Sequence, residues 1–350
     1  MKVELKKIFL EVKIEMNKRL LNLTMLILMF FVFLLSNSFA TEQIDIIAIS
    51  APPGGSWYTI MGGMAEIIKE EDPNINIKVT PGGSLENVLR VASNEAQLGF
   101  TFPLWIIQAL EHSGDYANRP KIEEGSVLIL AGGFGSSPKQ FVIFADLAEQ
   151  YGIKTVKDLF DKKVPMKICV NKPGSSELWS LEQIFEFYGV TFEDLKSWGG
   201  KIYYGAYNSS IQLLQDKHAN ALIVDANPPA SPILEVQLSR KLKLIPLNQD
   251  FIDYLVNEKG HDYAVIPAGT YEGQDVDIPT ATMLTLLITN NKLPEDVAYS
   301  IIKIMDKNKE RIKSLSPALK TFDTEISWKT LSTLLHPGAE KAYKELGYIK

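Results

Sequence analysis

Three short segments of this chain place proline, glycine and serine directly before a helical pattern. They read PPGGSW at 52–57, TPGGSL at 80–85 and KPGSSE at 172–177. Glycine lets a ligand approach the backbone, and serine caps a helix or donates to a carboxylate. The first turn of a helix also offers unpaired amides and the positive end of the helix dipole. Three such loops therefore predict a pocket that binds an anion through neutral groups.

The same loops have a simpler interpretation, in which each serine only caps its own helix and each glycine only makes the turn. That interpretation is favoured for one loop alone, whereas three loops of one pattern favour binding. Neither G-x-x-x-x-G-K-[ST] nor G-x-G-x-x-G occurs at these loops, so a nucleotide site is not supported. The candidate ligand-binding residues here are Gly54, Gly55, Ser56, Trp57, Tyr58, Gly83, Ser84, Asn87, Gly174, Ser175 and Ser176.

Two further residues, Asn208 and Asn227, are candidates because they follow expected strands. Asn208 either caps a helix or points into the site. Asn227 follows the strand NALIVDA, and the carboxyl ends of strands line the clefts of such folds. Asp225, in the same segment, would oppose an anion unless the ligand carries an ammonium group, as an amino acid does.

Strands alternate with helices along most of the chain. The expected strands are 44–50, 75–80, 96–102, 126–134, 139–145, 166–171, 201–207, 220–226 and 241–247. The expected helices are 58–70, 84–92, 155–162, 177–188, 209–217, 294–314 and 328–346. This alternation indicates an α/β architecture whose sheets are covered on both faces.

The N-terminal segment is typical of a secretory signal peptide. The apolar run MLILMFFVFLL at 25–35 follows Lys18 and Arg19 and precedes SNSFA, which predicts cleavage after Ala40. An uncleaved membrane anchor is the alternative. Residues 1–40 carry six Lys/Arg and three Asp/Glu, so the other 310 residues have a net charge of −9, against −6 for the whole chain. This acidity argues against nucleic-acid binding.

Neither the cysteine nor the histidines of this chain suggest a metal or a redox role. The single cysteine, Cys169, lies in an apolar strand and makes an intrachain disulfide impossible. None of the four histidines has a second ligand at metal-binding spacing. No metal and no cofactor are therefore expected.

Several longer segments resemble the TAXI family, the extracytoplasmic solute receptors of tripartite ATP-independent periplasmic (TRAP) transporters. These segments are PGGSWYTIMGG, TPGGSLENVLRVASNEAQLGF, KPGSSE, IPAGTYEGQDVDIPTATMLTLLI, LPEDVAYSIIKIM and LHPGAEKAYKELGYI. The resemblance implies a two-lobed periplasmic binding protein of the type II class, with hinge strands and the ligand in the cleft between the lobes. After the expected signal peptide at 1–40, it implies one lobe from 41–138 and 280–350 and a second lobe from 139–279. The family often has Gln, a small polar residue and Asp where this chain has FTFPLW. Thr101 and Phe102 therefore replace polar groups of the family, and the resemblance implies that they form a more apolar wall of the ligand site.

The resemblance implies a periplasmic or cell-exterior receptor that binds a small organic anion or an amino acid and delivers it to TRAP membrane permease subunits. A dicarboxylate, glutamate and 2-oxoglutarate are the first candidates for the ligand. One alternative is an exported receptor that reports its ligand to a membrane signalling protein. Another is an exported α/β hydrolase with a loop serine as nucleophile, although G-x-S-x-G is missing. The sequence thus predicts a binding protein and not an enzyme.

Overall fold

The computed structural model describes residues 2–36 and 43–350. It forms two compact units, Met1–Ile44 and Asp45–Lys350, and each is described by itself. In the first unit, the helix α1 (Lys2–Ser36) contains the apolar run expected for a signal peptide. Among the described residues, no helix is both long enough and apolar enough to cross a membrane. The predicted cleavage site after Ala40 lies outside the described residues.

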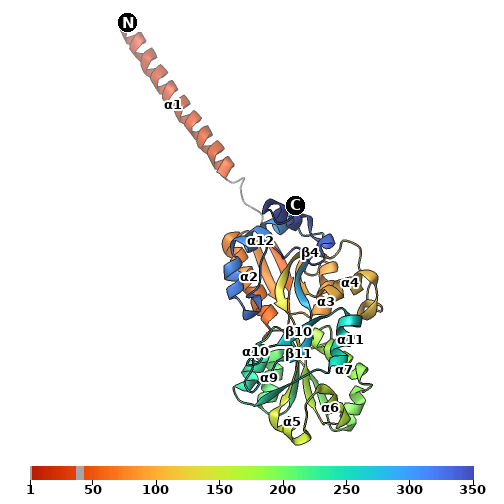
Figure 1. The fold of residues 1–350 in the computed structure, drawn as a ribbon. Coiled ribbons are helices and arrows are strands. Elements are labelled where there is room, and N and C mark those ends of the chain that lie inside the picture. The colour runs from red at the N-terminus through yellow and green to blue at the C-terminus, as the bar shows by residue number, and fades with distance from the viewer. Residues whose placement is uncertain (1, 37–42) are drawn as a thin grey trace. The chain divides into compact units, whose positions relative to one another are not determined.

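The second unit contains two five-stranded sheets, which Figure 1 shows one above the other. The first sheet has the order β2-β1-β3-β12-β4, with β1 parallel to β3 and β12 antiparallel to both of its neighbours. Its strands are β1 (Ile44–Ile49), β2 (Ile75–Thr80), β3 (Leu98–Thr101), β4 (Leu128–Ser136) and β12 (Leu284–Thr289). Its helices are α2 (Ser56–Glu71), α3 (Ser84–Ala92), α4 (Pro103–Glu111), α12 (Glu295–Lys307), α13 (Lys309–Ser314) and α14 (Pro337–Glu345).

The second sheet has the order β7-β6-β8-β5-β9. The strand β6 is parallel to β7 and β8, and β5 is antiparallel to β8 and β9. The strands are β5 (Lys139–Phe144), β6 (Lys167–Val170), β7 (Lys201–Tyr204), β8 (Ala221–Asp225) and β9 (Leu242–Ile245). The helices are α5 (Ala145–Tyr151), α6 (Val156–Asp161), α7 (Ser176–Phe187), α8 (Phe192–Ser197), α9 (Tyr207–Gln215), α10 (Ser231–Gln237) and α11 (Gln249–Lys259).

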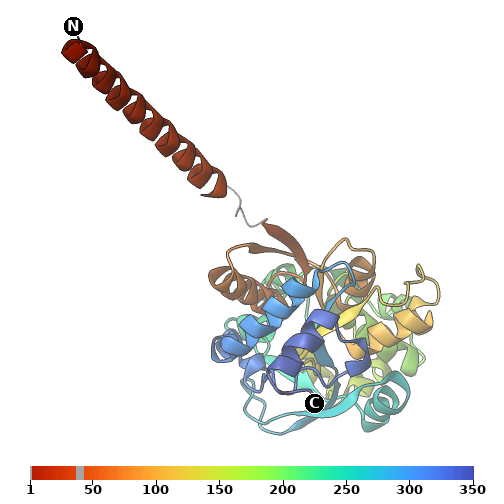
Figure 2. The ribbon, with the colours of Figure 1, turned by 90° about the horizontal axis from the view of Figure 1, so that it is seen from above.

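Local sequence accounts for many of these elements. All residues of β3 and β8 are buried, as expected of strands covered by helices on both faces. The helix α12 follows Pro294, has Glu295 and Asp296 in its first turn near the positive end of its dipole, and buries a face of Val, Ala, Ile and Met. It packs on α14, and Figure 2 shows the two blue helices side by side.

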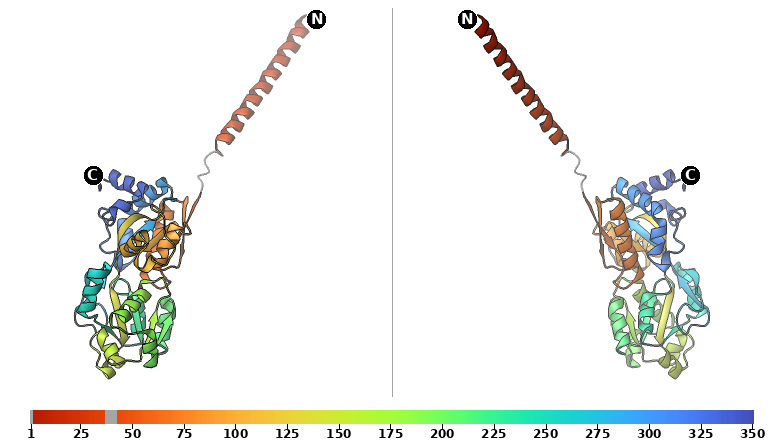
Figure 3. Two further views of the ribbon diagram at one scale, coloured as in Figure 1. Left: turned by 90° about the vertical axis from the view of Figure 1, so that its right-hand side faces the viewer. Right: turned by 90° about the vertical axis from the view of Figure 1, so that its left-hand side faces the viewer.

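Two adjacent connections join the sheets, as the views in Figure 3 show. The chain leaves β4 at Ser136 and enters β5 at Lys139, and it returns from β11 (Ile278–Thr282) through Met283 into β12. The amide of Ser137 donates to the carbonyl of Met283 at 2.9 Å, so the connections are hydrogen-bonded to each other. The strand β11 also pairs with β10 (Asp262–Ile266) in a separate two-stranded sheet.

The prediction of an α/β fold with two sheets is confirmed, and most predicted elements are present with shifts of a few residues. Two helices were predicted too long. The helix expected over 328–346 is confined to α14, because Pro337 opens it and a 3₁₀ turn, Ser332–Leu334, precedes it. The helix expected over 294–314 divides at Asn308 into α12 and α13. The sequence prediction also missed the helices α4, α5, α8, α10 and α11 and the strand β10.

Candidate ligand-binding site

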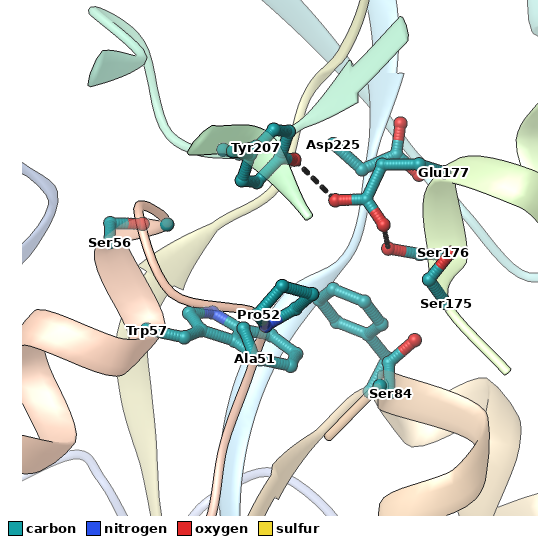
Figure 4. A pocket seen from close by; sticks show the side chains of 14 residues that line it. Ala51, Pro52, Ser56, Trp57, Ser84, Ser175, Ser176, Glu177, Tyr207 and Asp225 are labelled. Atoms are coloured by element: carbon teal, nitrogen blue, oxygen red, sulfur yellow. Dashed lines mark hydrogen bonds between the residues drawn. The ribbon is translucent and has the colours of Figure 1, made fainter. Parts of the chain in front are cut away.

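A cavity of about 30 Å³ lies where loops from both sheets meet (Figure 4). Its lining residues are Ala51, Pro52, Gly55, Ser56, Trp57, Gly83, Ser84, Phe102, Ser175, Ser176, Glu177, Tyr207, Asp225 and Ala226. They follow, or end, the strands β1, β2 and β3 of the first sheet and β6, β7 and β8 of the second. The cavity therefore lies at the carboxyl ends of both sets of strands, the usual position of ligand sites in open α/β sheets.

All three proline-glycine loops meet at this place. A neighbouring cavity of about 340 Å³ shares Pro52, Gly83 and Ser175 with the first one. Prolines from each loop, together with Glu86 and Lys172, line this second cavity.

Backbone amides at the N-terminus of α3 already have hydrogen-bond acceptors within the chain. The amides of Leu85 and Glu86 donate to the carbonyl oxygen of Gly174, at N···O distances of 3.1 and 3.5 Å. The amide of Gly83 donates to Oδ1 of Asn87 at 3.0 Å. A Cβ atom on Gly83 would lie 2.4 Å from the Gly174 oxygen, so a side chain has no room there. The loop at 80–85 is thus in direct contact with the loop at 172–177.

The N-termini of α2 and α7 lie at the cavity from opposite sheets (Figure 4). Within residues 43–350, no hydrogen bond is made by the backbone amides of Ser56, Trp57 and Ser176. The hydroxyl of Ser175 has the simpler role, because its Oγ accepts from the amide of Leu178 at 3.3 Å and caps α7. These free amides and the two helix dipoles suit a carboxylate.

A buried carboxyl group, that of Glu177, lies beside these amides. Its Oε1 accepts a hydrogen bond from the hydroxyl of Tyr207, and its Oε2 accepts from Oγ of Ser176 at 3.5 Å. Burial, and secondly the negative charge of Asp225, raise the pKa of Glu177 above its ordinary value. Burial and the neighbouring carboxylate likewise raise the pKa of Tyr207, so its hydroxyl keeps its proton.

The second carboxyl group, that of Asp225, belongs to a buried ion pair. Its Oδ2 accepts from Nζ of Lys139 at 2.9 Å and from Oγ of Ser180 at 2.7 Å, and both charged side chains are at most 1% exposed. Burial raises the pKa of Asp225, and the charge of Lys139 opposes this shift. The ion pair fixes the end of β8 beside the start of β5.

The opposite wall of the cavity is aromatic. The ring centroid of Trp57 lies 5.0 Å from that of Phe102 and 5.6 Å from that of Phe100. The indole N–H of Trp57 donates to Oγ1 of Thr285 in β12 at 3.2 Å, which holds the ring in place. The site thus combines an apolar wall with amide donors and two carboxyl groups.

The structure brings eight of the predicted site residues to the cavity and leaves seven away from its lining. The eight are Gly55, Ser56, Trp57, Gly83, Ser84, Phe102, Ser175 and Ser176. The seven are Gly54, Tyr58, Asn87, Thr101, Gly174, Asn208 and Asn227.

Several of the seven have contacts that hold the loops together. Nδ2 of Asn87 donates to the carbonyls of Ser50 and Phe100, each at 2.7 Å, and the hydroxyl of Thr101 donates to the carbonyl of Ser84 at 2.7 Å. A Cβ atom on Gly54 would lie 2.3 Å from Oδ1 of Asn208, so loop 51–55 touches α9.

Sequence reasoning missed Glu177 and Tyr207 as site residues. Glu177 lies in the first turn of α7, where an acidic residue ordinarily stabilises the helix through its dipole and has no role in binding. Tyr207 follows the strand β7 of the second sheet, and this position after a strand was the sequence signal that could have indicated a site residue.

Two covered α/β sheets, joined by two adjacent connections and with a cavity at the carboxyl ends of both, define a periplasmic-binding-protein-like architecture. The chain belongs to the NMT1-like family, which it matches over residues 49–347. This family comprises substrate-binding proteins and not enzymes, so the prediction of a protein that binds without catalysis is confirmed at the level of the family.

Solved structures of binding proteins are similar to this chain. MatC from Rhodopseudomonas palustris, with bound malate, matches with a TM-score of 0.51 and 11% identity, over 86% of this chain and 98% of that chain. The alkanesulfonate-binding protein SsuA from Xanthomonas axonopodis pv. citri, bound to MOPS, matches with a TM-score of 0.40 and 10% identity, over 89% of this chain and 86% of that chain. The similarity to MatC shows the fold, and the predicted two-lobed periplasmic binding protein class is confirmed.

Proposed function

We propose that this protein is a TAXI-type extracytoplasmic receptor of a TRAP transporter. It binds a small organic carboxylate in the cavity described above and delivers it to the membrane permease subunits. The observation that carries this proposal is the convergence of the N-termini of α2 and α7, from different sheets, on one cavity. Their free amides provide a carboxylate site without arginine or lysine.

Two further observations support this function. The TAXI-like segments are spread over most of the chain after residue 50, in the family order. MatC, which shares the fold, was solved with malate, a small organic acid. A dicarboxylate, glutamate and a 2-oxoglutarate-like acid are therefore the starting candidates.

We further propose that residues 41–138 with 280–350 and residues 139–279 act as two lobes that close on the ligand. The paired connections at Ser137 and Met283 are suited to hinge motion, because only two short segments have to change conformation. The contact between Gly83 and Gly174 then forms part of the closed state.

A ligand of this site is expected to raise the melting temperature of the protein, since it binds the folded form and not the unfolded chain. The test is a thermal-shift screen of organic acids and amino acids on protein that a bacterial host exports from the full-length gene. At a concentration of about 100 times Kd, the ligand is expected to stabilise the fold by about 2.7 kcal/mol. If no small carboxylate shifts the transition, the proposed function is wrong.

The site of action is proposed to be the periplasm or the cell exterior. The apolar run at 25–35, followed by SNSFA, supports export and cleavage after Ala40. The exported protein is expected to begin at Thr41, which intact mass measurement checks. A mass that retains residues 1–40 would instead indicate a membrane-anchored receptor.

A further inference from the structure

The charged side chains that line the cavity are both acidic. Among its described lining residues, Glu177 and Asp225 are the charged ones, and no lysine, arginine or histidine contributes to the wall. Lys139 lies behind Asp225, and its charge is paired with Oδ2 of that residue. Ionised Glu177 and Asp225 therefore leave one negative charge in excess over Lys139, and both of these acidic residues are buried.

Hydrogen-bond acceptors and donors around the cavity also lack partners. The side chain of Asp225 is fully buried, and its Oδ1 has no hydrogen-bond partner in the part of the chain that the structure describes. Across the described residues, the same is true of the buried Oγ of Ser84, which also lines the cavity. A buried carboxylate oxygen without a donor is unfavourable, so a ligand that donates there gains free energy.

The cavity also offers groups of the reverse character. The free amides of Ser56, Trp57 and Ser176, at two helix N-termini, favour a negatively charged group. One small cavity thus places amide donors for an anion close to buried carboxylate acceptors. A ligand with one carboxylate and one protonated nitrogen satisfies both.

We propose that the ligand is a compact amino acid of zero net charge, whose ammonium group binds Asp225 and Glu177 and whose carboxylate binds the amides of α2 and α7. This inference rests on the proposed function, because it names the ligand class of the same cavity. A second carboxylate on the ligand would lie beside Glu177 and Asp225, where like charges repel strongly because both carboxyl groups are buried. The cavity volume of about 30 Å³ corresponds to two or three water molecules, which also favours a compact ligand.

Isothermal titration calorimetry on the exported full-length product tests this with ligands matched in size. L-alanine is compared with L-lactate and pyruvate, which have a hydroxyl or a carbonyl in place of the ammonium group. 4-Aminobutyrate is compared with succinate, which has a second carboxylate in its place. We expect the amino member of at least one set to bind about tenfold to hundredfold more tightly than its counterparts, as loss of a charged hydrogen bond predicts.

The variant Glu177→Gln keeps the size of the side chain and an acceptor for Tyr207 but removes the charge. It is expected to weaken binding of the preferred amino acid about tenfold, with little change for lactate. Glu182→Gln is the matched control, because Glu182 lies on the same helix with its side chain exposed and outside the cavity lining. A circular dichroism melt checks that each variant is folded, and the comparison of ligands on the unmodified protein does not depend on any variant.

The outcomes separate the two proposals. Tighter binding of succinate, lactate or pyruvate than of their amino counterparts overturns this inference and leaves the receptor function standing. Undiminished affinity of folded Glu177→Gln for the amino acid also overturns it. Failure of every organic acid and amino acid to bind overturns the receptor function itself.

Discussion

Replacement of Gly83 by valine is expected to weaken ligand binding by about a hundredfold or more, because it prevents closure of the two sheets' loops. A Cβ atom at this position would lie 2.4 Å from the carbonyl oxygen of Gly174 and 2.8 Å from its carbonyl carbon. These are backbone atoms of the opposing loop, which have no alternative rotamer. The loops must therefore move apart, and the amides of Leu85 and Glu86 lose their acceptor.

The same variant is expected to keep a cooperative thermal transition. Gly83 has φ −153° and ψ 149°, an extended conformation that valine adopts readily, so the substitution causes no backbone strain within its own loop. Calorimetric titration with the ligand found by the thermal-shift screen measures the loss of affinity. Gly62→Ala in α2 is the control, because a Cβ atom there meets no atom within 4 Å. An unchanged Kd in Gly83→Val would show that this contact is not part of the bound state.

Replacement of Lys139 by methionine is expected to destabilise the protein by about 3–5 kcal/mol, because it leaves the carboxylate of Asp225 buried without its counterion. The two side chains are 1% and 0% exposed, and their Nζ and Oδ2 atoms lie 2.9 Å apart. The hydroxyl of Ser180 would remain as a partner of Oδ2, but one neutral donor does not replace a charge. Urea unfolding, followed by circular dichroism, measures the change in the free energy of unfolding.

A second substitution distinguishes the loss of the counterion from the loss of packing. The double variant Lys139→Met/Asp225→Asn removes both charges and is expected to recover a large part of the lost stability. Lys196→Met is the control for loss of a surface ion pair, since Lys196 and Glu193 are 74% and 83% exposed. It is expected to change stability little. Equal stabilities for the single variants at Lys139 and Lys196 would contradict the assigned role of the buried pair.

The features that the sequence predicted are those with local signals. The alternation of apolar strands with capped helices indicated the two sheets, and the repeated proline-glycine loops indicated where helices begin near a shared site. The run at 328–346 misled, because its apolar pattern continues through residues that Pro337 separates from the helix. Local pattern therefore predicted much of the architecture, and eight of the fifteen residues named for the site line the cavity.

The remaining features depend on residues that are distant in the sequence. The group formed by Lys139, Ser180 and Asp225 comes from three separate elements, and none of the three has a distinctive neighbour in the sequence. The bond from α3 to Gly174 exists only when the two loops are in contact. Sequence reasoning treated Asp225 as an obstacle to an anion unless the ligand carries an ammonium group, and the structure adds Glu177 as a second acidic group of the cavity lining.

The carbonyl of Gly174 satisfies the first turn of α3 with no solute involved. If the lobes close as proposed, this contact stabilises the shut form without a solute, so we expect the shut form to be populated in both the vacant and the loaded protein. If the proposed membrane partner recognised only the outer shape of the shut form, it would also bind vacant receptors. Its ion gradient would then be used without any solute being transported. Productive transport then requires that the partner also respond to occupancy of the cavity, for example through the lifetime of the shut form, which a bound solute prolongs.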